Sequence, residues 1–195
     1  MLFRSDEITR LMRNVRVDVP GALDDVIKLK LFGAVSDFMD RSGVVYEEDT
    51  FTIVADQLEY DVSVTGPYQI TRLLSLRDTN DAEISGTMDV PGVVRLLTSP
   101  SAGNVYTYTL GIKPIDPVDN DGYVQCPDWI IQRYGSVIEA GVKGMLYQMP
   151  NKPYSNERMA IYNMRTFNAG IGSARVDAAR RNRYRSNQWA FPPFA

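Results

Sequence analysis

The stretch from Pro127 to Pro150, PDWIIQRYGSVIEAGVKGMLYQMP, decides the fold. Its apolar residues recur at steps of three and four, a spacing typical of a helix with one buried face. Pro127 stands where a first helical residue has no backbone hydrogen bond to lose, and Asp128 favours the positive end of the helix. The stretch therefore predicts a long helix that stops at Pro150.

Three glycines, Gly135, Gly141 and Gly144, lie inside this predicted helix, where each costs about 1 kcal/mol relative to alanine. We expect them to mark close packing against another backbone. The next predicted helix runs from about Ser155 to Arg181, is capped by Ser155 or Asn156, and reaches roughly 40 Å at 1.5 Å per residue. Its apolar seam has heptad-like steps and becomes small toward its end: Ala160, Met164, Phe167, Ile171, Ala174 and Ala178.

The region before Gly43 is also predicted to be helical. Ser5, Asp6 and Glu7 favour the start of a short helix. Pro20 is expected to open a second helix, which Ser42-Gly43 ends.

Between Gly43 and Gln125 the pattern changes to short runs of β-branched and aromatic residues separated by turn residues. These runs predict strands within 51–54, 58–64, 68–76, 93–97 and 105–110. Five or six short strands with such punctuation are typical of a small antiparallel sandwich or barrel.

Together these patterns predict an α+β fold. Residues 1–43 and 126–181 form a bundle of about four helices, and residues 44–125 form an inserted antiparallel β module that is sandwich-like or barrel-like. Residues 182–195 do not fit the helical pattern and are expected to form an extended C-terminal tail.

The composition excludes much catalytic chemistry. The chain has 195 residues, no His and a single Cys, Cys126. A Ser-His-Asp or Cys-His nucleophile system, a His-ligated metal, an internal disulfide and a cysteine zinc site are therefore all excluded. No stretch approaches the roughly 20 apolar residues that span a bilayer, and no secretory pattern is present, so we expect a soluble protein with no membrane partner.

The acidic clusters raise the question of metal binding or catalysis by carboxylates. Asp119-Asn-Asp-Gly122 is similar to the start of a calcium loop, but no acid stands at the closing position, so a solvated turn is favoured. The other acids have no fixed partner and are expected on a solvated surface. Cys126 has no accompanying base or motif and is expected to be a small buried or semi-exposed residue. We therefore predict no catalytic residue, no metal site and no cofactor.

The formal net charge of -3 hides an uneven distribution. Residues 171–195 carry five Arg and one Asp, a sum of +4, so the first 170 residues sum to -7. Residues 43–128 hold 14 acidic and four basic residues. The Arg-rich end also carries Trp189, Phe191 and Phe194, and Arg with aromatic residues is the composition of an interface anchor. A docked C-terminal segment is therefore favoured over a free one.

Nucleic-acid binding is the rival explanation for this composition, because guanidinium groups meet phosphates and aromatic rings stack on bases. The acidic body argues against it, since like charge repels a polyanion. Only the C-terminal segment, or a face with Arg4, Arg10, Arg13 and Arg16, could attract one.

Several blocks of the sequence resemble a known family. They are PDWIIQRY at 127–134, IEAGVKGMLYQMPNKPYSN at 138–156, and the helix end ARVDAARR at 174–181. The segment LFGAVSDFMDRSG at 31–43, followed by a strand ending in Tyr60, is similar to the N-terminal half of the same family. The family is that of the head-to-tail adaptor proteins of tailed bacteriophages, including the tail tubular protein A type, and the resemblance covers most of the chain in order.

The resemblance implies a structural virion protein of the neck or tail, made in the host cytoplasm and without catalytic activity. Such adaptors form a ring, typically a dodecamer, beneath the portal protein. The ring extends the channel for DNA, which passes without specific binding, and offers its other face to the tail nozzle or the next tail tubular component.

Carried over by position, the portal-contacting element is Arg180 to Ala195. Within it we single out Arg180, Arg181, Arg183, Tyr184, Arg185, Trp189, Phe191 and Phe194. For packing between neighbouring copies in the ring we expect the seam residues Ala160, Met164, Phe167, Ile171 and Ala174. A DNA-binding accessory protein that uses the Arg-rich C-terminus is the alternative, and a carboxylate-based, metal-assisted hydrolase is a third hypothesis.

Overall fold

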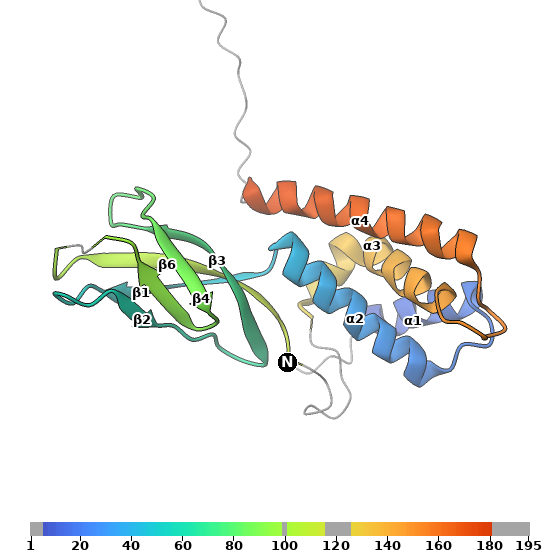
Figure 1. Ribbon diagram of the computed structural model, residues 1–195. Helices are drawn as coiled ribbons and strands as arrows, with labels where there is room; N and C mark the ends of the chain where they lie inside the picture. The colour runs from blue at the N-terminus through green and yellow to red at the C-terminus, as the bar shows by residue number, and fades with distance from the viewer. Residues whose placement is uncertain (1–5, 99–100, 116–125, 181–195) are drawn as a thin grey trace, which may run out of the picture.

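The computed structural model describes residues 6–98, 101–115 and 126–180, which form an α+β fold, as the sequence predicts (Figure 1). The helices lie at one end of the molecule and the strands at the other, here called the helical body and the β module. In chain order the elements are α1 (Asp6–Asp18), α2 (Asp24–Ser42), β1 (Tyr46–Thr52), β2 (Glu59–Asp61), β3 (Tyr68–Arg77), β4 (Gly86–Val90), β5 (Val93–Leu96), β6 (Val105–Pro114), α3 (Asp128–Tyr147) and α4 (Glu157–Ala179).

α3 lies at the centre of the helical body, because its contacts with α1, α2 and α4 are together more extensive than those of any other helix. The core between the helices is built from fully buried side chains that include Ile27, Phe38, Ile138 and Phe167. None of the helices that the structure describes combines the length and the apolar character needed to cross a membrane.

The helix ends follow local signals at two places and depart from them at a third. Gly43 ends α2 in the left-handed conformation (φ 63°), and its N–H donates to the carbonyl of Met39 at 3.1 Å. Asn156 caps α4, accepting from the N–H of Met159 at 3.1 Å. The prediction that Pro20 opens the second helix is wrong, because Gly21 (φ 88°) turns the chain and α2 begins only at Asp24.

The β module consists of two three-stranded antiparallel sheets, with strand orders β1-β6-β3 and β2-β5-β4. The ring of Phe51 in the first sheet stacks on Tyr60 in the second, with 4.4 Å between centroids, and on Tyr108 of β6 at 5.8 Å. The module is therefore an open sandwich, since neither sheet, within the residues described, closes into a barrel.

Two strands differ from the sequence prediction. β4 was not among the expected strands, and β1 begins at Tyr46, five residues before the expected Phe51. β1 is an edge strand that leaves most of the run Glu47-Glu48-Asp49 exposed, and no side chain of β4 is fully buried. Because apolar alternation marks only half-buried strands, neither segment carries a clear strand pattern.

Candidate functional site

The buried seam of α4 packs against α3 of the same chain. Its members Ala160, Phe167, Ile171 and Ala174 are buried, and Met164 is half-buried. The expectation that these residues pack between neighbouring copies of a ring is therefore wrong for the four buried ones, whose side chains the chain itself already covers, and it stays a prediction for Met164.

The glycines of α3 explain how closely the two helices approach. A Cβ placed on Gly141 would lie 2.8 Å from the ring of Phe167, and one on Gly144 would lie 2.7 Å from Sδ and 3.2 Å from the backbone nitrogen of Met164. The predicted close packing against another backbone is confirmed at Gly144, whereas Gly141 packs closely against a side-chain ring instead. The prediction is wrong at Gly135, where the nearest atom is 3.8 Å away, in Ile131 of the same helix.

Of the eight residues expected to contact a portal, the structure describes only Arg180. It is the C-cap of α4, its backbone N–H donates to the carbonyl of Val176 at 3.0 Å, and it is exposed. The other seven lie outside the described residues, so their role stays a prediction: Arg181, Arg183, Tyr184, Arg185, Trp189, Phe191 and Phe194.

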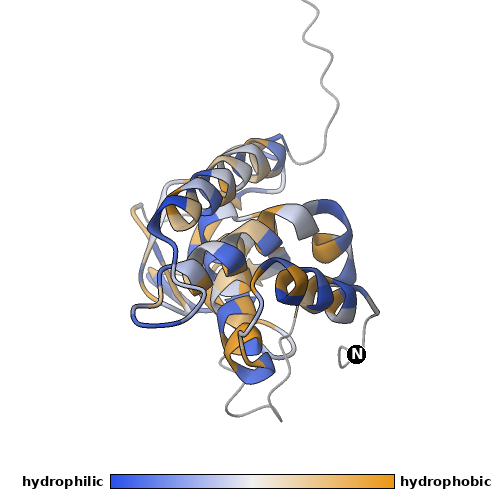
Figure 2. Cartoon of the chain, turned by 90° about the vertical axis from the view of Figure 1, so that its right-hand side faces the viewer, coloured by the Kyte–Doolittle hydropathy of each residue, from blue (hydrophilic) through white to orange (hydrophobic). Residues whose placement is uncertain are grey.

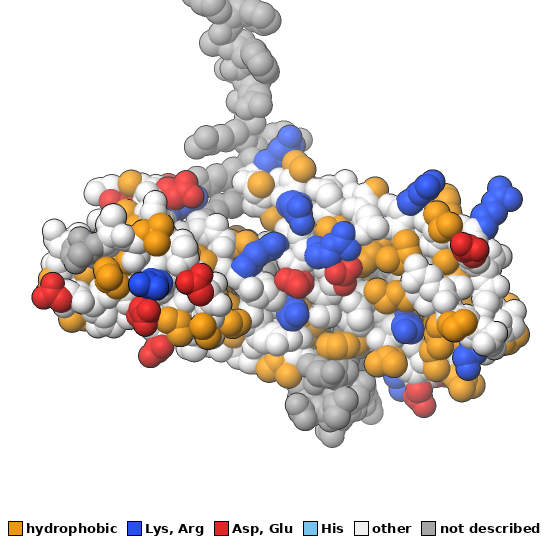
Figure 3. All heavy atoms as spheres, in the orientation of Figure 1, with side chains coloured by type: hydrophobic (Ala, Val, Ile, Leu, Met, Phe, Trp, Pro, Cys, Tyr) orange, Lys and Arg blue, Asp and Glu red, His pale blue; other side chains and the backbone are white. Residues whose placement is uncertain are grey.

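The outward side of α4 carries a second seam that the sequence analysis did not identify. This outer seam repeats the heptad-like steps two positions before the buried seam, and all of its members are exposed: Arg158, Tyr162, Arg165, Ala169, Gly172 and Val176. Figure 3 shows basic side chains spread along the helical body on this side. A Cβ on Gly172 would meet nothing within 4 Å, so packing within the chain does not require this glycine.

Three apolar side chains near the corner between α1 and α2 are exposed. Val17, Leu23 and Leu29 are 74%, 72% and 62% exposed. Asp24 pairs with Arg16, whereas the Asp25 side chain is 96% exposed and lies 3.7 Å from Lys28. We call Val17, Leu23, Asp25 and Leu29 the α1–α2 corner.

Two arginines bind the end of α2: Arg72 joins the β module to the helical body, and Arg175 joins α4 to α2 within the helical body. Nη2 of Arg72 on β3 donates to the carbonyl of Asp40 at 2.7 Å, and Nε and Nη2 of Arg175 on α4 donate to the carbonyl of Arg41 at 3.2 and 2.9 Å. These carbonyls belong to the last turn of α2, where the helix dipole favours positive charge. A groove of about 560 Å³ lies at this junction, lined by both arginines and by Leu74.

α3 bends at Tyr134, which has non-helical angles (φ -119°, ψ 15°). The Tyr134 hydroxyl donates to Oδ2 of Asp177 on α4 at 2.9 Å, and Nη2 of Arg133 lies 2.9 Å from the same oxygen. Burial, together with the hydrogen bond to Asp177, raises the pKa of Tyr134 to about 12. The hydroxyl therefore keeps its proton at neutral pH and joins α3 to α4 as a donor.

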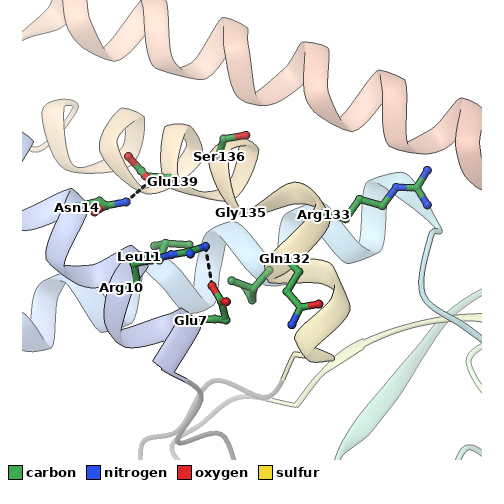
Figure 4. A pocket seen from close by; sticks show the side chains of 10 residues that line it. Glu7, Arg10, Leu11, Asn14, Gln132, Arg133, Gly135, Ser136 and Glu139 are labelled. Atoms are coloured by element: carbon green, nitrogen blue, oxygen red, sulfur yellow. Dashed lines mark hydrogen bonds and ion pairs between the residues drawn. The ribbon is translucent and has the colours of Figure 1, made fainter.

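A polar pocket of about 320 Å³ lies between α1 and the bent part of α3 (Figure 4). Glu7 pairs with Arg10 at 2.6 Å, and Glu139 accepts from Asn14 at 3.3 Å and pairs with Lys143 at 2.5 Å. Both carboxylates are therefore already paired within the chain, and Glu139 joins side chains of α1 and α3.

Lys143, beside this pocket, also pairs with Asp18 at the end of α1. Burial lowers the pKa of Lys143, but its hydrogen bonds to Asp18 and Glu139 raise it by more, so the pKa is raised overall. The amine is therefore charged at neutral pH and acts as a link between α1 and α3 rather than as a base.

The described part of the chain contains no group of three or more side chains that could hold a metal ion. Cys126 is buried, and burial with the nearby charge of Asp128 raises the pKa of its thiol, which makes it a poor nucleophile. The calcium-like turn Asp119–Gly122 lies outside the described residues.

Charge differs between the two ends of the molecule. Residues 44–115 of the β module hold ten acidic and four basic residues, whereas residues 6–43 and 126–180 hold eleven acidic and thirteen basic residues.

In comparisons with known proteins, no family model and no curated protein matches this chain. Function must therefore be argued from the surfaces themselves.

Proposed function

We propose that this chain is a head-to-tail adaptor of a tailed bacteriophage, a structural protein of the virion neck. The observation that carries the proposal is the position of α4. This helix lies along one side of the helical body, keeps an exposed outer seam, and leads at Ala179 directly into the Arg-rich and aromatic residues 180–195 (Figure 1). One helix thus supports both lateral packing and an anchoring segment.

In the proposed assembly, copies pack side by side through their helical bodies into a ring that extends the DNA channel. The ring is expected to be a dodecamer, as in the family that the sequence resembles. The acidic β module supports a channel function, since carboxylates repel phosphate and let DNA pass without binding. The Arg residues of 180–195 bind portal acids or carbonyls, the aromatic rings fill portal pockets, and the opposite face of the ring binds the tail nozzle or the next tail component.

Deletion of residues 182–195 tests the anchor. The truncated chain is expected to lose addition to purified portal protein, measured by co-sedimentation, while its circular dichroism and unfolding midpoint stay unchanged. Folding is expected to survive because the core is built from side chains before residue 181. A control chain with the order of residues 182–195 scrambled keeps their charge and aromatic content, and it is also expected not to bind. Undiminished portal binding by the truncated chain would rule out the anchoring role.

A salt titration with duplex DNA separates this proposal from a DNA-binding accessory protein. Phosphate binding must weaken steeply as salt rises, whereas an adaptor is expected to have little affinity at physiological salt. Pairing of Arg10 with Glu7 and of Arg16 with Asp24 supports weak binding by α1. Tight, salt-sensitive DNA binding that disappears with residues 182–195 would favour the accessory protein instead.

A further inference from the structure

We infer that the outer seam of α4 binds the α1–α2 corner of a second copy of this chain. The contact joins two different surfaces and repeats around a ring. The inference deepens the proposed function, on which it rests for the role of the ring in the virion. The two surfaces differ, so each bound copy still offers one free surface of each kind to the next copies.

Exposed apolar side chains are the first support. Tyr162 on the outer seam is 65% exposed, and the three apolar residues of the corner are at least 62% exposed. Tyr is enriched in the cores of protein interfaces, and exposed apolar surface gains free energy when a partner covers it. Gly172 leaves open space farther along the same seam, where a neighbouring copy can approach the α4 backbone closely.

Charge favours contact between the outer seam and the α1–α2 corner over contact between two outer seams. Arg158 and Arg165 stand one turn before and one turn after Tyr162, and among the described residues neither forms an ion pair. The corner offers the carboxylate of Asp25, whose side chain is 96% exposed and whose pair with Lys28 at 3.7 Å is long and solvated, so the carboxylate stays accessible to a second copy. Opposite charges favour contact between seam and corner, whereas two outer seams would bring arginines together and repel each other. A symmetric α4–α4 dimer is therefore disfavoured.

The α1–α2 corner and the start of the outer seam lie at the same end of the helical body. The Tyr147 hydroxyl donates to the carbonyl of Asp18 at the end of α1 at 2.8 Å, and the Tyr147 carbonyl accepts from the N–H of Asn156, the cap of α4, at 3.0 Å. Figures 1 and 2 place α4 on the upper side of this end and the start of α2 on its lower side. Complementary surfaces at one level let successive copies be related by a rotation without a shift along the axis, which a closed ring requires.

Cross-linking of the purified full-length chain tests the contact. Tyr162→Cys and Leu23→Cys are made singly and together, and each chain is treated at high protein concentration with a short bis-maleimide. The parent chain is the control, since its Cys126 is buried with a raised thiol pKa. The double variant is expected to give a ladder of dimers, trimers and larger products, because every copy links in both directions. A mixture of the two single variants is expected to stop at dimers, and each single variant alone is expected to stay monomeric.

Charge reversal gives a second test in the same assay. Arg165→Glu in the double-cysteine chain is expected to reduce the yield of trimers and larger products about tenfold, and adding Asp25→Arg is expected to restore it. The matched control is Arg95→Glu, which reverses an exposed arginine in the β module and is expected to leave the ladder unchanged.

Two results would overturn the inference: a double-cysteine chain that stays monomeric, or a Tyr162→Cys chain that links to itself. The two proposals fail separately. A ladder from a chain that does not add to the portal would leave the contact standing and refute the adaptor function, whereas portal addition without a ladder would refute only this contact.

Discussion

Gly170 and Gly172 lie two positions apart on α4 and face opposite surroundings. A Cβ on Gly170 would overlap the side chain of Val137 in α3, whereas one on Gly172 would meet open space. Alanine at each of the two positions therefore distinguishes the effect of packing on stability from the effect of helix propensity.

Gly170→Ala is expected to lower the free energy of unfolding by about 1–3 kcal/mol, because overpacking outweighs the roughly 1 kcal/mol gain in helix propensity. Gly172→Ala is expected to raise it by up to about 1 kcal/mol, because only the propensity gain remains. Urea unfolding of both full-length variants, at a protein concentration low enough to keep the chain monomeric, measures the difference. Shifts of the same sign would contradict the assigned packing.

For single residues, the sequence predicts where glycine is required, but it does not show which neighbouring atoms require it. Gly144 is confirmed as a point of close approach to another backbone and Gly141 packs closely against a side-chain ring, while Gly135 follows the bend at Tyr134 instead. Helical spacing indicates which residues share a face, but it does not show which neighbour that face meets. For the same reason the seam from Ala160 to Ala174 could be predicted as buried while the assignment of its four buried members to a contact between copies was wrong.

At the scale of elements, the end of α2 is where the two parts of the molecule meet. Arg72 from β3 and Arg175 from α4 bind carbonyls of the same helical turn. Removing Arg72 leaves these carbonyls partly uncapped at a half-buried site, so the contact between strand and helix weakens.

Arg72→Met is expected to lower the free energy of unfolding by about 1–3 kcal/mol, measured by urea titration. Arg95→Met is the matched control in the same module. Its guanidinium is more than half exposed and lies 3.9 Å from Glu59, so a change within about 0.5 kcal/mol is expected. Equal losses from the two variants would show that Arg72 does not hold the junction.

Elements with a full apolar stripe could be predicted from the sequence, and elements with exposed sides could not. α3 and α4 bury continuous faces, so their periodicity is clear. β4 and the first half of β1 lie where solvent reaches the sheet, and their composition carries no alternation. The outer seam of α4 has the same spacing as the buried seam. The sequence alone does not show which of these two seams α3 covers.

At the scale of the whole molecule, one core runs through both parts. Buried residues of the helices and of the sheets belong to a single cluster, and α2 contacts β6. We therefore expect that the helical body and the β module are not independently stable.

Unfolding of the full chain is expected to occur in a single cooperative transition. Helix loss by circular dichroism and loss of amide-exchange protection in β6 should give the same midpoint in urea. A β module that opens at lower urea than the helices would contradict the shared core.

The charge separation of the molecule could be read from the sequence, because it depends only on where the acids lie in the chain. The α1–α2 corner could not, because helical spacing places Leu23 on the apolar stripe of the second helix, whereas Leu23 stands before α2 and is 72% exposed. Val17 and Leu29 lie off the apolar stripes, and both are exposed.

The helical body is closed by contacts between distant parts of the chain. Asn14 and Asp18 bind Glu139 and Lys143, 125 residues later, and Arg175 binds the carbonyl of Arg41 across 134 residues. At about 5–20 residues per second, a ribosome needs roughly 6–25 s to deliver the partner of α1 after α1 itself. Residues 181–195 leave the ribosome only after α4. A chain whose synthesis stops before α3 therefore lacks the contacts that close the body, and under the proposed function a chain that stops before residue 182 also lacks the anchor.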